Sequence, residues 1–173
     1  MGDREIERAV REHLDALGEP YELLPCDPAL ADTAAFCEHY GIPLEQSANC
    51  IVVASRREPK RYCACLALAT TRVDVNKTVK RLLDAGRVSF APPEETKALT
   101  GMEIGGVTPF ALPDDLPLYV DRRVMEAPVV WVGGGSRSQK IGIAPVVFTL
   151  MSNVTVIEDL AFLAEREQRP DQP

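Results

Sequence analysis

The sequence predicts an α+β domain with a mixed, largely antiparallel sheet flanked by helices. Segments with helical spacing of apolar residues are interspersed with short apolar runs typical of strands. Two strand-like runs, 50–54 and 62–70, are joined by the polar segment 55–61, which is a hairpin pattern. The 173 residues contain no internal repeat and no linker. We therefore expect a single domain at 1–164 and a polar tail at 165–173.

The first predicted elements are a helix at 3–17 and a strand at 21–26. Asp3 is placed to cap the start of this helix and Gly18 to end it. Its apolar residues recur at helical spacing and predict one buried face: Ile6, Val10, Leu14 and Leu17.

A second helix is predicted at 32–40, before the hairpin. Asp32 or Thr33 can cap it, and Gly41 can end it. The hairpin turn carries a local group of basic residues, which is either a patch for one nucleic-acid end or a solvated loop: Arg56, Arg57, Lys60 and Arg61.

The second half alternates short elements. A third helix is predicted at 75–85, with Asp74 as its cap and Gly86 as its stop. Prolines at the start predict a helix at 92–100, and a short one is expected at 145–151. The remaining runs predict strands at 88–91, 117–121, 129–133, 140–144 and 154–157.

Charge and composition argue against several classes of function. The net charge is −7, from 19 basic and 26 acidic residues, which argues against binding to long nucleic acid. No run of about 18 apolar residues predicts a membrane span. The charged N-terminus MGDREIERAV does not resemble a signal peptide, so we expect a cytoplasmic protein.

The cysteines and histidines predict neither a disulfide framework nor a metal site. The five cysteines are odd in number and form no CxxC pair, and Cys63 and Cys65 would share one face of a strand. The only histidines, His13 and His39, lie in helical patterns. We expect buried thiols, no metal and no other cofactor.

Two glycine clusters are candidates for the chemistry. The first lies in GMEIGGVTPFALP, 101–113, and the second in VGGGSRSQ, 132–139. Consecutive glycines can aim several N–H groups at one oxygen, although they also serve as ordinary turns. Neither cluster is a Rossmann fingerprint or a Walker loop.

The first cluster resembles the GxxxGGVxP segment of the YbaK/EbsC family, whose members are related to the editing insertion of bacterial prolyl-tRNA synthetases. Three further segments are similar to the family and in the same order: TAAFCEHYGIPLEQ at 33–46, VDVNKTVKRLL at 73–83 and VVWVGGGSRSQKIGI at 129–143. The resemblance covers roughly residues 20–160. It implies an α+β domain with a barrel-like sheet, and hydrolysis of mischarged aminoacyl-tRNA in trans.

The resemblance also implies a site and a partner. An aminoacyl ester is already reactive, so the site needs donors for the carbonyl and a sized pocket rather than a strong nucleophile. The expected partners are an aminoacyl-tRNA 3′ end or a small amino-acid-like ligand, whereas the oligomeric state is open. The implied substrate-binding residues are Gly101, Gly105, Gly106, Val107 and Pro109, with Gly134, Gly135 and Ser136 opposite.

One departure concerns the residue implied to be catalytic. Members of the family usually carry a lysine at the start of the strand after a PxxQ-like turn, and PLEQSANCIVV, 43–53, places Asn49 there. An asparagine amide can donate to a carbonyl or orient water, but it supplies no cation. The sequence thus leaves two functions open: a deacylase, and a binding module that has lost its catalysis.

Other side chains near this position have alternative interpretations. Cys50 would point to the face opposite Asn49 if both lie on a strand. Thr33 is either a helix cap or a substrate contact. Arg137 is either a phosphate ligand or simply an exposed loop residue. Asp74 is expected to be a helix cap and Lys77 and Lys80 to be solvated.

Overall fold

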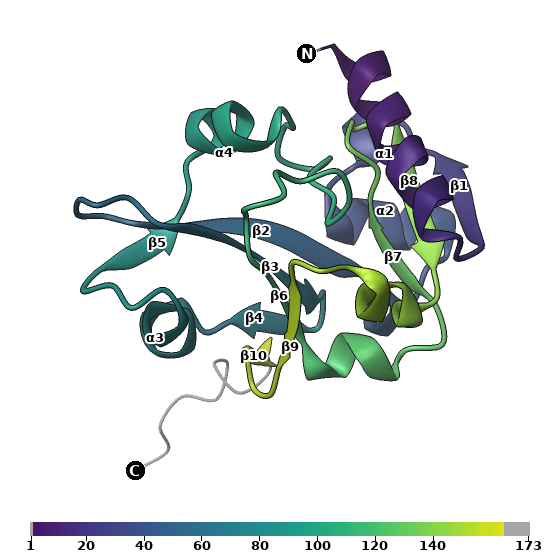
Figure 1. Cartoon of the computed structure of the whole chain (residues 1–173). Coiled ribbons are helices and arrows are strands. Elements are labelled where there is room, and N and C mark those ends of the chain that lie inside the picture. The colour runs from purple at the N-terminus through teal and green to yellow at the C-terminus, as the bar shows by residue number, and fades with distance from the viewer. Residues whose placement is uncertain (1, 165–173) are drawn as a thin grey trace.

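Three β-sheets with helices packed on their outer faces make up the computed structural model, which describes residues 2–164 (Figure 1). The α+β class is confirmed, and five of the seven strand pairs described are antiparallel. The predicted tail at 165–173 lies outside the described residues. Within 2–164, none of the helices has the length and apolar character needed to cross a membrane.

The largest sheet has five strands in the order β5-β2-β3-β6-β9. The predicted hairpin forms its centre, because β2 and β3 pair antiparallel with Asn49 opposite Ala67. β6 and β9 continue the sheet in parallel register. The strands are β2 (Ala48–Ser55), β3 (Tyr62–Leu68), β5 (Val88–Phe90), β6 (Leu118–Asp121) and β9 (Val154–Ile157).

Two smaller sheets complete the framework. One has the order β1-β8-β7, with β1 (Tyr21–Pro25), β7 (Val130–Gly133) and β8 (Gln139–Ile143). The other pairs β4 (Thr71–Val73) with β10 (Ala161–Leu163), two strands that the sequence did not predict. A bridge between Ser47 and Trp131 joins the three-stranded and five-stranded sheets. Apart from this bridge the described strands form three separate sheets, which do not close into the expected barrel.

The helices match the predicted segments with small shifts. They are α1 (Asp3–Leu17), α2 (Thr33–Tyr40), α3 (Lys80–Leu82) and α4 (Pro93–Thr100). Gly2, not Asp3, is the N-cap of α1, because helical geometry already begins at Asp3. The segment 75–85 is less regular than predicted, since one π-turn, η3 (Val75–Val79), precedes α3.

Short 3₁₀ turns connect several elements: η1 (Pro28–Leu30), η2 (Leu44–Gln46), η4 (Arg122–Glu126) and η5 (Pro145–Leu150). Of these, only η5 was predicted. η1 and η2 flank α2, a helix that has little amphipathic character of its own.

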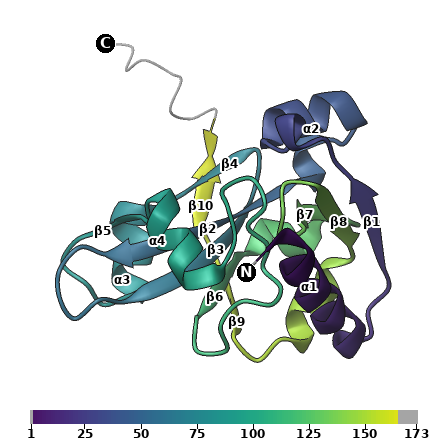
Figure 2. The same cartoon turned by 90° about the horizontal axis from the view of Figure 1, so that it is seen from above.

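The main core lies between the five-stranded and three-stranded sheets and is covered by α1. Ile6, Val10 and Leu14 of α1 are buried there, as their spacing predicts. Each such side chain contributes about 1.5–3 kcal/mol when fully removed from water. Figure 2 shows α1 packed beside β7 and β8, with α2 at the far end of the same sheet.

Candidate functional site

A cavity of about 390 Å³ lies where α2, β2, β7 and the segment 104–107 meet. Its lining is mostly apolar, with a small number of polar groups, as is usual for small-molecule sites. The apolar residues include Phe36, Ile51, Ile104, Val107 and Trp131. The polar or charged residues are Asp32, Thr33, Ser47, Asn49, Cys50 and Lys140.

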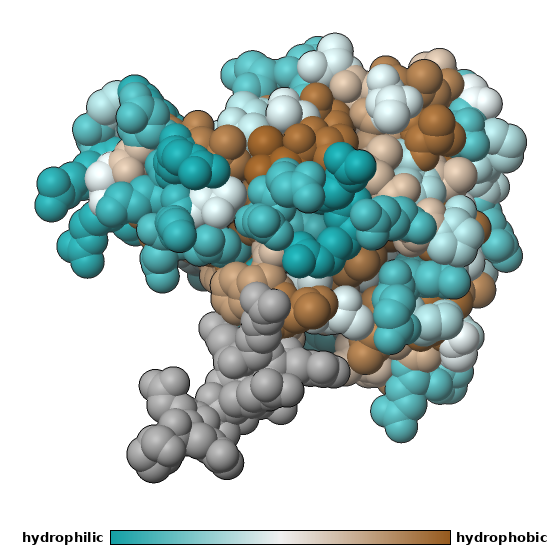
Figure 3. Space-filling view, turned by 90° about the horizontal axis from the view of Figure 1, so that it is seen from below, coloured by the Kyte–Doolittle hydropathy of each residue, from teal (hydrophilic) through white to brown (hydrophobic). Residues whose placement is uncertain are grey.

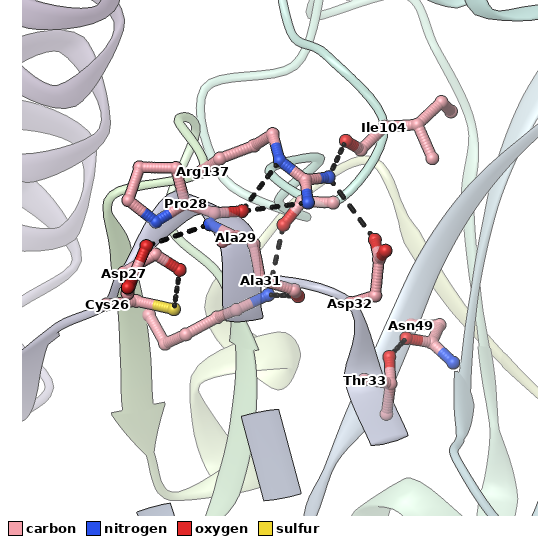
Figure 4. A network of polar contacts seen from close by, with 12 residues as sticks. Cys26, Asp27, Pro28, Ala29, Ala31, Asp32, Thr33, Asn49, Ile104 and Arg137 are labelled. Carbon is pink, nitrogen blue, oxygen red and sulfur yellow. Dashed lines mark hydrogen bonds and ion pairs between the residues drawn. The ribbon is translucent and has the colours of Figure 1, made fainter. Parts of the chain in front are cut away.

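Asn49 lines this cavity from β2, and Thr33 meets it from the first turn of α2. The Thr33 hydroxyl donates a hydrogen bond of 2.5 Å to Oδ1 of Asn49 (Figure 4). Thr33 is thus not the N-cap of α2, which is Asp32. Among residues 2–164, the Asn49 amide nitrogen makes no hydrogen bond, so both of its N–H donors remain available to a ligand.

Cys50 follows Asn49 on the strand and belongs to the main hydrophobic core. Burial, and to a smaller extent the neighbouring Cys63, raises the pKa of its thiol to about 12. The thiolate is the nucleophilic form of cysteine, and it is scarcely populated at neutral pH in this environment. The thiol is therefore unsuited to attack a substrate, although Cys50 contributes to the lining of the cavity, from which strand alternation predicted that it would point away.

The first glycine segment contributes Gly105 and Val107 to the lining of the cavity. Gly101 lies at the C-cap of α4, and its N–H donates to Lys97. Gly106 and Pro109 are buried and do not line this cavity, and Pro109 lines a separate, smaller cavity.

The second glycine segment packs directly against the first. Gly135 N–H donates to Gly106 O at 2.8 Å, and Gly106 N–H donates to Glu103 O at 2.9 Å. These two N–H groups are therefore paired within the protein. The expectation that they point at a ligand is wrong for both. In the described chain, Gly105 N–H has no such partner, and Gly105 adopts a φ of +93° that favours glycine.

Gly133 lines the cavity, whereas Gly134, Gly135 and Ser136 do not. The Ser136 hydroxyl donates to Glu7 on α1, which anchors the loop to that helix. The close approach of the two segments explains the glycines, because a Cβ at Gly106 would lie 2.6 Å from the main chain of Ser136.

Lys140 is a cavity residue that the sequence analysis missed. It lies at the start of β8, is only 7% exposed, and its Nζ donates to Ala31 O at 2.7 Å and Gly105 O at 3.0 Å. The ammonium also lies 5.3 Å from the centre of the Phe36 ring. Desolvation is the main cause that lowers the pKa of Lys140. The sequence feature that could have identified Lys140 is a single lysine in an apolar strand, on the same face of that strand as Gly142.

Arg137 is not the free exposed side chain that its loop position suggested. Its guanidinium donates to Pro28 O and to Ile104 O, and pairs with Asp32 at 3.2 Å (Figure 4). Together, Lys140 and Arg137 tie the segment that precedes α2 to the segment 104–105. Two cations, Arg137 in one loop and Lys140 in the strand that follows it, thus hold these two segments together at the cavity.

The structure also shows where the cysteines and the other polar candidates lie. All five cysteines are free and buried, and no group of three or more potential metal ligands occurs within residues 2–164. Lys77 and Lys80 are exposed as predicted. Asp74 is the N-cap of η3, but its carboxylate accepts from the Thr78 hydroxyl rather than from a backbone N–H.

Comparisons with known proteins agree with this architecture. The chain is similar to the crystal structure of a proposed trans-editing enzyme for prolyl tRNA synthetase (24% identity, TM-score 0.74, 88% of this chain and 94% of that chain). It is also similar to the crystal structure of a hypothetical protein (25% identity, TM-score 0.79, 89% and 99%). The uncharacterized protein YwhH of Bacillus subtilis (strain 168) is 25% identical over 138 residues, which are 80% of this chain and 85% of YwhH.

A family model provides the assignment. The model of the aminoacyl-tRNA editing domain matches residues 27–149, which is more than half of the chain and includes α2, β2, both glycine segments and Lys140. The chain therefore belongs to the aminoacyl-tRNA editing domain family, the YbaK family.

Proposed function

We propose that the protein is an aminoacyl-tRNA deacylase that hydrolyses the ester of mischarged tRNA in trans. The observation that carries the proposal is the free Asn49 amide at the wall of a cavity of about 390 Å³, in a chain of the editing family. The similarity to a proposed trans-editing enzyme supports the same reaction class.

The proposed chemistry needs no side-chain nucleophile. A water oxygen bonds to the ester carbonyl carbon, the bond from that carbon to the ribose oxygen breaks, and the proton released from water goes to the ribose oxygen. The products are a free amino acid and a tRNA with a free terminal hydroxyl. The Asn49 amide and the Gly105 N–H are the donors that we assign to the carbonyl oxygen, where negative charge develops.

The Thr33 hydroxyl has a supporting role in this scheme. By donating to Asn49 Oδ1, it fixes the orientation of the amide and leaves the nitrogen free to donate to a ligand. The apolar residues around the cavity would limit the size of the amino-acid side chain, in the way that hydrophobic pockets discriminate by volume.

Release of free amino acid from a panel of mischarged tRNAs tests the proposal directly. We expect release from at least one of them, and we expect Asn49→Ala to reduce the rate by roughly a hundredfold, the usual cost of removing one oxyanion donor. Gln46→Ala is the matched control, because it removes an amide three residues away that does not line the cavity. No release from any tRNA by the folded protein would overturn the proposal.

A second candidate is a binding module without hydrolysis, favoured by Asn49 in the place of the lysine usual in the family. Asn49→Lys separates the two. A deacylase should lose activity in this variant, because a second ammonium would enter a cavity that already holds Lys140. A module that lacks only the cation should instead gain hydrolysis.

A further inference from the structure

Lys140 is a charged residue that the proposed chemistry does not use. It lines the cavity of about 390 Å³, which we call the first cavity, and it is only 7% exposed. An ammonium group has three N–H donors, and within residues 2–164 only Ala31 O and Gly105 O accept from it. One donor is therefore left for an acceptor that the described residues do not supply.

The charges around Lys140 do not balance. Arg137 pairs with Asp32 at 3.2 Å (Figure 4), whereas no carboxylate of the described chain forms an ion pair with the Lys140 ammonium. One carboxylate thus stands against two cations on this side of the cavity. A buried cation without a counter-ion is costly, and desolvation accordingly lowers the pKa of Lys140. A ligand that brings a negative charge to this position removes the imbalance.

The basic residues of the β2–β3 turn are a weaker candidate for an anion site. Arg56 and Arg61 each pair with a carboxylate already. Arg57 and Lys60 are exposed, and Figure 3 shows hydrophilic residues covering this end of the molecule. Water and salt screen charges at such a surface, whereas an ion pair in a mostly apolar cavity is screened much less. The buried ammonium of Lys140 is therefore the stronger attractor for an anion.

The groups near Lys140 fit a carboxylate better than a phosphate. Arg137 commits its guanidinium to carbonyl oxygens and to Asp32 of the protein itself. Phosphate sites commonly use the bidentate fork of a free arginine, whereas Lys140 offers a single remaining N–H. The rings of Phe36 and Trp131 line the same cavity and suit a ligand with an apolar part.

We propose that the first cavity takes a ligand with a carboxylate group, which accepts a hydrogen bond from the remaining N–H of Lys140 while the apolar part of the ligand packs against the rings. The inference rests on the proposed deacylase function for the identity of the ligand. An aminoacyl ester has no free α-carboxylate. The carboxylate therefore belongs either to an acidic side chain of the aminoacyl group, so that Lys140 selects the substrate, or to the amino acid released by hydrolysis, so that Lys140 retains the product.

Calorimetric titration of the full-length wild type at pH 7 with two pairs of probes tests the proposal and separates the two sources. L-Alanine and L-alaninamide differ only in the α-carboxylate. The α-amide and the diamide of L-aspartic acid differ only in the side-chain carboxylate. In at least one pair, we expect the carboxylate to bind about tenfold or more tightly than its amide, and that pair identifies the source. Equal affinity within both pairs, or no binding of any probe, would overturn the proposal.

Lys140→Met tests whether the preference comes from this ammonium. The variant keeps the length of the side chain and removes the charge, so the two members of the discriminating pair should bind within about twofold of each other. Lys77→Met is the matched control, because Lys77 is exposed and does not line the first cavity, and it should keep the full preference. A preference for the carboxylate that survives in Lys140→Met would contradict the proposal.

A measurement on the wild type decides the case in which Lys140→Met does not fold. In protein labelled with ¹³C and ¹⁵N at lysine, the Cε and Nζ resonances of Lys140 should shift when the tighter-binding carboxylate is added. The matching amide should leave both resonances nearly unchanged. Saturation with the carboxylate without a shift at Lys140 would place the ligand elsewhere and reject the proposal.

The deacylation assay distinguishes failure of this inference from failure of the proposed function. The probes contain no ester, so their binding is measured whether or not any tRNA is hydrolysed. If mischarged tRNA is hydrolysed, the tighter-binding carboxylate should raise the apparent KM and leave kcat unchanged. Hydrolysis without any preference for a carboxylate would reject this inference alone. Carboxylate binding that depends on Lys140, without hydrolysis of any tRNA, would reject the deacylase and retain the carboxylate site.

Discussion

One wall of the first cavity consists of main chain packed on main chain, whereas the other consists of side chains that rise from β2 and α2. The first, which we call the main-chain wall, consists of 104–107 and 133–135, of which Ile104, Gly105, Val107 and Gly133 line the cavity. Most of its polar groups are already paired. In the second, the side-chain wall (Thr33, Phe36, Asn49 and Ile51), the Asn49 amide keeps its donors. From this comparison we propose that the glycines give the cavity its shape and that the asparagine supplies its chemistry.

The largest effect should come from filling the main-chain wall. A Cβ at Gly106 would meet the Ser136 main chain at 2.6 to 3.0 Å, and a main chain cannot move aside cheaply. We expect Gly106→Ala to lower the free energy of unfolding by about 3 kcal/mol in urea denaturation. Gly86→Ala is the control, because nothing lies within 4 Å of its Cβ, and it should change stability by less than about 0.5 kcal/mol.

The next effect should come from the cation that ties the two walls. Lys140→Met keeps the length of the side chain but leaves Ala31 O and Gly105 O without their donor. We expect a loss of about 2 kcal/mol in thermal or urea denaturation. Lys77→Met removes an exposed lysine and should be nearly neutral. If both variants are equally stable, the main-chain wall does not depend on Lys140 for its stability.

On the side-chain wall, removing one hydroxyl should affect activity more than stability. Thr33→Val is nearly isosteric and deletes the donor to Asn49 Oδ1. We expect deacylation to fall about tenfold, equivalent to about 1.4 kcal/mol in the transition state, because the amide loses its fixed orientation. Thr33→Ser keeps the hydroxyl and should retain most of the activity. Loss of stability without loss of turnover would make Thr33 a purely structural residue.

The spacing of apolar residues and the glycines at the ends of elements predicted most of the fold. The boundaries of α1, α2 and the β2–β3 hairpin follow from them, since each of these elements is defined by local sequence. β4 and β10 were missed because a strand of three residues is too short to show a periodic pattern. Their pairing also joins segments about ninety residues apart, which local sequence does not reveal.

The site could be predicted only in part, for a related reason. Asn49, Gly105 and Val107 were identified from the resemblance to the family, whereas Thr33 was left open between a helix cap and a substrate contact; all four line the cavity. The roles of Lys140 and Arg137 depend on carbonyl oxygens of residues about 30 to 110 positions away, and backbone acceptors carry no sequence signature. Spacing also cannot reveal whether a glycine N–H faces a ligand or a neighbouring strand.

The smallest effect is a pH dependence at the far end of the first glycine segment. His13 on α1 accepts a 2.7 Å hydrogen bond from Ala111 N–H through Nδ1, so the bond requires the neutral ring. Desolvation lowers the pKa of His13 below its ordinary 6.5, partly opposed by Asp114. A lowered pKa means that the unfolded chain binds the proton more readily. The stabilising effect of the neutral ring is thus complete above about pH 6.5 and is lost as the pH falls toward the folded-state pKa.

Urea denaturation between pH 7.5 and pH 5 measures this effect. We expect the wild type to lose more stability than His13→Gln over this range, because the variant has no ring to protonate. His39→Gln removes an exposed histidine and should follow the wild type. If His13→Gln and the wild type lose stability in parallel, α1 does not anchor the end of the segment through His13, and the main-chain wall depends on its glycine contacts and cations alone.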